Sequence, residues 1–112
     1  MRQLPDKIRF KMDRPKLEAY IAITDNLLAS YTEYPDEPMD QVDKLLIVLL
    51  TRINLKLRTM QLKLQYHFYL NIPIEQAMAL HIALKECGGM FHKNWLSHYY
   101  DGIMLQIDPI LL

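Results

Sequence analysis

The side chains best suited to chemistry in this sequence are one cysteine and four histidines, and their positions disfavour both a reactive thiol and a metal site. Cys87 comes just before Gly88-Gly89, at the expected end of a helix, where the negative end of the helix dipole disfavours a thiolate. No two histidines stand three or four residues apart, the spacing that presents two zinc ligands on one helix face. We therefore expect a structural cysteine, no metal and no cofactor. The histidines are His67, His81, His92 and His98.

Three acidic residues, Glu37, Asp40 and Asp43, recur at three-residue spacing, which is compatible with a divalent ion. The glycine and the alternating oxygen ligands of a calcium loop are missing, however. The helix dipole alone favours acids in a first turn. Glycine-rich phosphate loops, Gly-x-Ser-x-Gly and His-Glu-x-x-His are also absent from the sequence. We predict that the protein is not an enzyme.

Charge is segregated along the chain, although 13 basic residues balance 13 acidic ones. The net charge is +4 over residues 1–16, −7 over 17–43, +5 over 44–63 and −2 over the remainder. One interpretation is that blocks of opposite sign lie together in the fold or across a contact between two copies. The other is that a basic surface binds an acidic partner or nucleic acid.

Composition predicts one globular domain over residues 1–112, because 51% of the 112 residues are apolar and no linker interrupts them. The longest uncharged apolar run is Leu45 to Leu50, far short of the roughly 20 residues that span a bilayer. We expect no membrane contact. A single cysteine favours a reducing compartment, so we expect a cytoplasmic protein.

The elements that would position these residues are four helices and an N-terminal arm over residues 1–13, in which Ile8, Phe10 and Met12 alternate with polar residues. The fold class predicted is all-α, a four-helix bundle-like single domain with a long central second helix, and no internal repeat is apparent. The first helix should open after Asp13 and end near Tyr34. The second covers Met39 to Leu70, the third runs from Asn71-Ile72-Pro73 to Gly88-Gly89, and the fourth runs from Asn94 to Ile107, before Pro109.

Between Ile53 and Phe68 two interpretations compete, because apolar and polar residues alternate there as in a strand. We favour a helix, since the residue types are strong helix formers and no glycine, proline or Asn-Gly pair supplies a turn near Thr59. Such a helix would be roughly 48 Å long, against a diameter of roughly 34 Å for the globule. It would carry apolar stripes on two opposite sides. One contains Ile53, Leu57, Met60 and Leu64, and the other contains Leu55, Leu62, Tyr66 and Tyr69.

A helix that is apolar on two sides needs two covers, so the sequence predicts an assembly module that forms a homodimer or binds an unidentified protein. The candidate interface is Leu55, Leu62, Tyr66 and Tyr69. The alternative is a small DNA-associated regulator. It would use the basic N-terminal arm and a basic stripe formed by Arg52, Lys56 and Lys63.

Three smaller expectations concern the C-terminal half. His81 falls on an apolar helix face and should be a hydrogen-bonded core residue, whereas His98 should pair with Asp101 one turn on. The apolar tail Ile110 to Leu112 should dock on the body or on a neighbouring chain.

Overall fold

The computed structural model describes residues 4–33 and 38–111, so Glu37 and Tyr34, near which the first helix was expected to end, lie outside the described residues. The elements are β1 (Lys7–Asp13), α1 (Arg14–Tyr31), α2 (Gln41–Gln61), β2 (His67–Pro73), α3 (Ile74–Cys87), the short 3₁₀ helix η1 (Gly88–Phe91) and α4 (Ser97–Leu111). Helix accounts for 69% and strand for 13% of these residues. The high helix content is confirmed, but the all-α class is wrong because the two strands form an antiparallel sheet.

The prediction of one long second helix from Met39 to Leu70 is wrong. The helix α2 ends at Gln61, and the strand β2 begins at His67. Its 21 residues span roughly 32 Å at about 1.5 Å per residue, which fits inside a molecule of 41 × 37 × 27 Å. The helix therefore does not extend beyond the rest of the molecule, so its length does not support a dimer.

Arg14 explains why the chain turns here without glycine or proline. Its guanidinium donates four hydrogen bonds, of 2.5 to 3.3 Å, to the backbone carbonyls of Gln61, Lys63 and Gln65. Carbonyls at the end of a helix lack intrahelical partners, and a cation that binds them stabilises the end. The turn is thus fixed by a residue about 50 positions away in the chain.

The two strands pair along their whole length, so the N-terminal segment is extended as predicted but is not a free arm. Phe10 lies opposite Leu70, and Lys7 lies opposite Pro73. Asn71-Ile72-Pro73, expected to open the third helix, closes β2 instead, and α3 begins at Ile74. Asn71 therefore caps no helix; its side chain bonds across the ribbon.

The burial pattern shows an internal repeat, although none is apparent in the sequence. Each strand buries alternate residues and leads directly into a helix, and the pattern of residues 7–21 recurs almost unchanged at 67–81. Phe10 and Leu70 are equivalent under this shift of 60 and are also paired across the sheet. An approximate twofold axis thus passes through that pair. The inward residues of the two strands are Ile8, Phe10 and Met12, and Phe68, Leu70 and Ile72.

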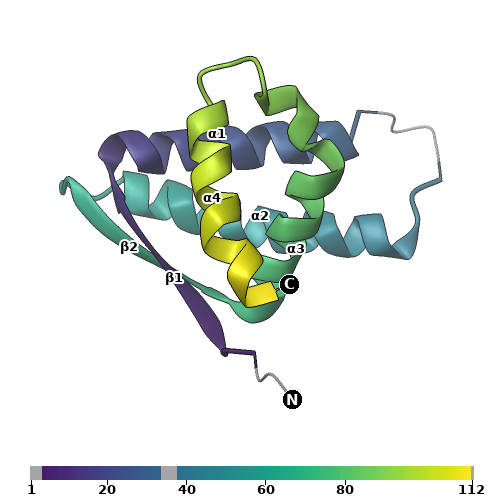
Figure 1. Cartoon of the computed structure of the whole chain (residues 1–112), viewed down its shortest axis with the longest axis horizontal. Helices are drawn as coiled ribbons and strands as arrows, with labels where there is room; N and C mark the ends of the chain where they lie inside the picture. Colours follow the sequence, from purple (N-terminus) through teal and green to yellow (C-terminus); the bar gives the residue numbers. More distant parts are fainter. Residues whose placement is uncertain (1–3, 34–37, 112) are drawn as a thin grey trace.

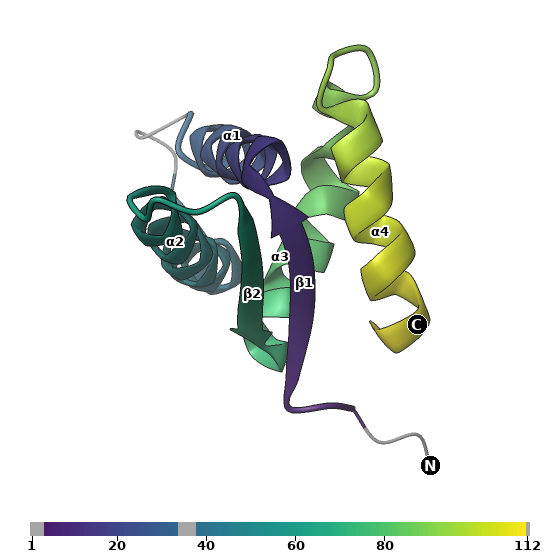
Figure 2. The ribbon, with the colours of Figure 1, turned by 90° about the vertical axis from the view of Figure 1, so that its left-hand side faces the viewer.

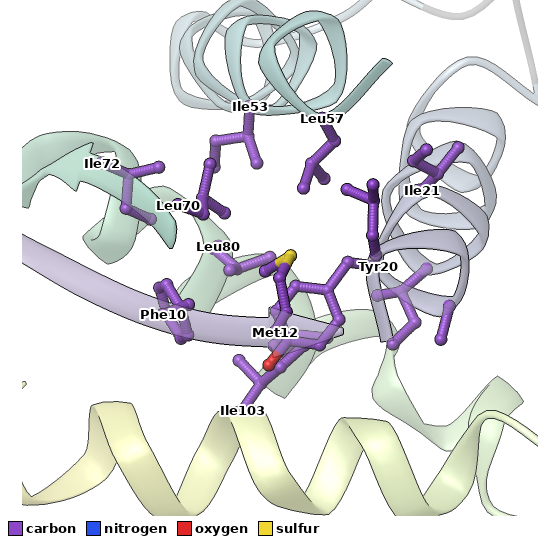
Figure 3. Close-up of a cluster of buried hydrophobic side chains, with 14 of the residues drawn as sticks. Phe10, Met12, Tyr20, Ile21, Ile53, Leu57, Leu70, Ile72, Leu80 and Ile103 are labelled. Atoms are coloured by element: carbon purple, nitrogen blue, oxygen red, sulfur yellow. The ribbon is translucent and has the colours of Figure 1, made fainter. Parts of the chain in front are cut away.

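Helices surround one side of this ribbon. In Figure 2 the ribbon crosses in front of α3, with α1 and α2 on one side of it and α4 on the other. Figure 1 shows α1 and α2 running side by side across the molecule. All four helices and both strands contribute to the main core, whose buried side chains in Figure 3 include Phe10, Met12, Tyr20, Ile53, Leu57, Leu70, Leu80 and Ile103. A smaller cluster of Leu46, Leu49 and Ala79 lies between α2 and α3.

The C-terminal helix continues to Leu111 with Pro109 inside it, so the predicted end before Pro109 is wrong. His81 is buried, and its Nε2 lies 2.6 Å from Asp108 Oδ1, which confirms a hydrogen-bonded core histidine. The ring of His98 contacts that of Tyr99, and no hydrogen bond described for it reaches Asp101. Ile110 and Leu111 pack against the core, while Leu112 lies outside the described residues. Among the described residues, no helix has the length and hydropathy needed to span a bilayer.

Candidate nucleic-acid interface

The outward face of the ribbon is the most distinctive surface of the molecule. The inward residues fill the core, and the residues that alternate with them point away from it. The outward positions hold Lys7, Arg9, Lys11 and Asp13 on β1, and His67, Tyr69, Asn71 and Pro73 on β2. Three of these residues are cationic at neutral pH, and the one acid, Asp13, lies at the end of β1 and accepts from the Lys16 amide.

Arg9 is held at the middle of this face. Its Nε donates to Asn71 Oδ1 at 3.0 Å, and its guanidinium carbon lies 5.4 Å from the centre of the Tyr69 ring. A hydrogen bond and a cation–π contact together restrict a side chain that would otherwise sample many rotamers. The two Nη groups have no hydrogen-bond partner among the described residues, so they remain available to a ligand.

Both edges of the ribbon are occupied by side chains. On the β1 edge, Lys16 Nζ donates to Lys11 O at 3.2 Å and Gln106 Nε2 donates to Arg9 O at 2.6 Å. On the β2 edge, Lys56 Nζ donates to Asn71 O. A strand edge whose carbonyls are engaged cannot readily accept another strand. The ribbon therefore presents its face to a ligand, with a lysine beside each edge.

The predicted basic stripe is partly assembled beside this face. Lys56 contacts the β2 edge, and Arg52 is exposed one turn earlier on α2. Lys63 lies in the connection between α2 and β2, where its carbonyl accepts from Arg14. The structure thus brings Lys56 to the ribbon and leaves Lys63 at its end.

The four predicted interface residues do not form one helical stripe. Leu55 lies on α2, Leu62 and Tyr66 lie in the connection after it, and Tyr69 lies on β2. All four are more than half exposed. Tyr69 belongs to the outward face of the ribbon, and a role for the set in dimerisation stays a prediction.

A second exposed feature is a shallow apolar groove of about 210 Å³ between α2 and α3. Its exposed residues are Val42, Leu45, Met78 and Ile82. Acidic groups lie at its end: partial desolvation, with the Asp40 and Glu86 carboxylates nearby, raises the pKa of Asp43. Burial, together with the 2.6 Å hydrogen bond to Glu86, also raises the pKa of Tyr31. This acidic end carries charge opposite to that of the ribbon.

No family model, curated protein or solved structure matches this chain. Its function must therefore be argued from its own geometry. Within residues 4–33 and 38–111, no three histidine, cysteine or acidic side chains come together as a metal site would require. Cys87 lies at the end of α3, with its sulfur 3.5 Å from Ser30 Oγ.

The sequence analysis missed the ribbon residues Arg9, Tyr69 and Asn71 as a group. The signal was present, because polar and apolar residues alternate both at 7–12 and at 66–72, and each stretch is followed at once by a helical pattern. Taken together, two such stretches predict two strands that can pair. Considered separately, the first appeared as an arm and the second as part of a helix.

Proposed function

We propose that this protein binds double-stranded DNA through the outward face of the β1–β2 ribbon. The observation that carries the proposal is a two-stranded ribbon, uncovered on one face, with Lys7, Arg9 and Lys11 on that face and a lysine beside each edge. This replaces the N-terminal arm and the Arg52/Lys56/Lys63 stripe of the sequence-based alternative with one structured surface.

The shape of the ribbon fits the major groove of B-form DNA. That groove is roughly 12 Å wide and admits a two-stranded ribbon, whose strands lie about 4.8 Å apart. Seven residues of strand extend over roughly 20 Å. The outward side chains can then meet base edges, while Lys16 and Lys56 lie beside the ribbon, where the flanking phosphates run.

The neutral net charge does not oppose this function, because the charges are segregated in space. Asp40, Asp43 and Glu86 gather at the far end of α2 and α3, away from the ribbon face. Cations on one surface attract phosphate locally even when the whole molecule is neutral.

The test is fluorescence anisotropy with a labelled 20-base-pair duplex at several salt concentrations. Each neutralised phosphate contributes about −0.9 to the slope of log K against log salt, so phosphate contacts by Lys7, Lys11, Lys16 and Lys56 predict a slope of about −3.6. The variant K7A/R9A/K11A should lose at least about tenfold in affinity. The variant K16A/K56A loses two of these contacts, so the magnitude of its slope should be smaller by about 2.

A matched control removes the same charge elsewhere. The variant K44A/K85A/K93A loses three exposed lysines that lie on α2, α3 and the connection before α4. It should bind as the wild type does. Equal losses in both triple variants would contradict a ribbon interface, as would the absence of binding at low salt.

The apolar groove between α2 and α3 supports a second candidate, self-association. Val42, Leu45, Met78 and Ile82 are 39% to 59% exposed and line one groove. Charges of both signs border it, because Glu75 lines the groove and Lys85 lies one turn after Ile82 on α3. A border of mixed sign can be complementary to itself about a twofold axis. The proposed occupant is therefore a second copy of the chain, and the groove leaves the ribbon face free.

Light scattering at micromolar concentration tests this candidate and should give about twice the chain mass of 13.3 kDa. Leu45→Glu should give a folded monomer. Leu64→Glu is the control, because Leu64 is fully exposed in the connection before β2. A wild-type monomer at every concentration would contradict self-association. Dissociation by Leu62→Glu but not by Leu45→Glu would place the contact at the originally predicted residues.

A further inference from the structure

The ribbon combines a symmetric backbone with asymmetric outward side chains. The approximate twofold axis through Phe10 and Leu70 relates the two strands and the helices that follow them. The outward positions do not obey it, because Lys7, Arg9 and Lys11 correspond to His67, Tyr69 and Asn71. The two halves of the ribbon would therefore meet a ligand with similar backbone geometry but with different hydrogen-bonding groups.

Arg9 has the geometry of a group that reads guanine. Its Nε is already bonded to Asn71 Oδ1, and its plane is supported by Tyr69, so the two Nη groups project as a fixed fork. Such a fork pairs with O6 and N7 of guanine in the major groove. Fixing the fork before binding reduces the entropy lost on recognition.

Asn71 has the complementary chemistry beside it. Its Nδ2 group donates no hydrogen bond among the described residues, and its Oδ1 keeps a second lone pair after accepting from Arg9. An amide with one free donor and one free acceptor matches N7 and N6 of adenine. In addition, Lys56 holds the backbone of Asn71 through its carbonyl, which positions the side chain at the β2 edge.

We infer that one chain recognises a DNA sequence without twofold symmetry, in which Arg9 contacts a guanine and Asn71 contacts an adenine in a neighbouring base pair. This inference rests on the proposed function and names its ligand more closely. A symmetric ribbon made of two identical strands would select a palindrome. Here the equivalents of Arg9 and Asn71 are Tyr69 and Lys11, so the preference for each half of the site differs.

The experiment is selection from a library of duplexes with 14 randomised base pairs at moderate salt, using the full chain with Leu45→Glu, so that each complex contains one ribbon even if the wild type forms a dimer. The expected result is an enriched motif that contains a guanine next to an adenine and lacks an inverted repeat. Arg9→Lys keeps the charge but loses the fork, so it should reduce the guanine preference at least about fivefold. Its affinity for unselected DNA should stay within about twofold of the wild type. Asn71→Ala should relax only the adenine position.

Arg52→Lys is the matched control, because it makes the same substitution at an exposed arginine of α2 that lies outside the ribbon and leaves the Arg9–Asn71 pair in place. It should leave the guanine preference unchanged. A palindromic motif would overturn the inference, and so would an unchanged motif with Arg9→Lys. Salt-dependent binding without any enriched sequence would overturn the inference and leave the proposed function standing. No binding to any duplex would overturn both.

Discussion

Replacing Arg14 should destabilise the protein and loosen the start of the second strand. The guanidinium makes four hydrogen bonds to three carbonyls, one at the last residue of α2 and two in the connection after it, and its carbon lies 5.4 Å from the centre of the Phe68 ring. A hydrogen bond to a charged group contributes about 1.5 to 3 kcal/mol when buried. These carbonyls are exposed and regain water when Arg14 is removed, so we assign about 0.5 kcal/mol to each bond. The expected loss for Arg14→Ala is therefore about 2 kcal/mol.

Urea unfolding followed by circular dichroism measures this loss. For a domain of this size, 2 kcal/mol corresponds to a decrease of about 8 °C in Tm. Arg14→Lys should recover less than half of the loss, because an ammonium cannot reach three carbonyls as a planar fork does. Arg52→Ala is the control, since Arg52 is exposed and makes none of these contacts. A change below 0.5 kcal/mol for Arg14→Ala, or full recovery by lysine, would refute the explanation given for the turn.

Two further substitutions test the packing. The hydroxyl of Tyr20 is buried without a hydrogen-bond partner among the described residues, so Tyr20→Phe should raise the free energy of unfolding by roughly 1 kcal/mol in urea titrations, and a loss of stability would contradict this. Burial also raises the pKa of Tyr20, so above about pH 10 the folded state keeps a proton that the unfolded state releases. The free energy of unfolding should therefore decrease as the pH rises above about 10, and the decrease should be smaller in Tyr20→Phe. Asp108→Ala should cost about 1 to 3 kcal/mol, because it leaves buried His81 unpaired, whereas Asp101→Ala on the same helix should have little effect; equal effects in thermal melts would argue against the pair.

Helix positions were predictable where local signals agree. Asp13 caps α1 by accepting from the Lys16 amide, as its position before Pro15 indicated. The α-helix α3 ends at Cys87, directly before Gly88-Gly89, where its end was predicted. These features depend on residues within a few positions of one another, which a single sequence displays directly.

The strand β2 was not predictable by the same argument, because its cause is not local. A strand normally needs a turn signal before it, and the connection from Leu62 to Tyr66 contains no glycine or proline. Arg14 supplies the missing interactions from the other half of the chain. The pairing of Phe10 with Leu70 likewise joins segments 60 residues apart.

The candidate site could be predicted only in part from the sequence. The excess of basic residues over 1–16 and 44–63 indicated two cationic segments, and Lys56 does lie beside the ribbon. The arrangement of Arg9, Tyr69 and Asn71 depends on strand pairing, so it could not be derived while the second strand was assigned to a helix. The repeat was hidden because, between residues 7–21 and 67–81, only Ala19 and Ala79 are identical.

The most direct test of the central claim, that the ribbon face binds DNA, is an NMR titration of the isotope-labelled protein with a short duplex. The account predicts that the amide signals of residues 7–11 and 67–71 shift most, with smaller changes at Lys16 and Lys56. The signals of Val42, Leu45, Met78 and Ile82, which line the α2–α3 groove, should not move. Shifts confined to that groove, or no shifts at low salt, would contradict the account.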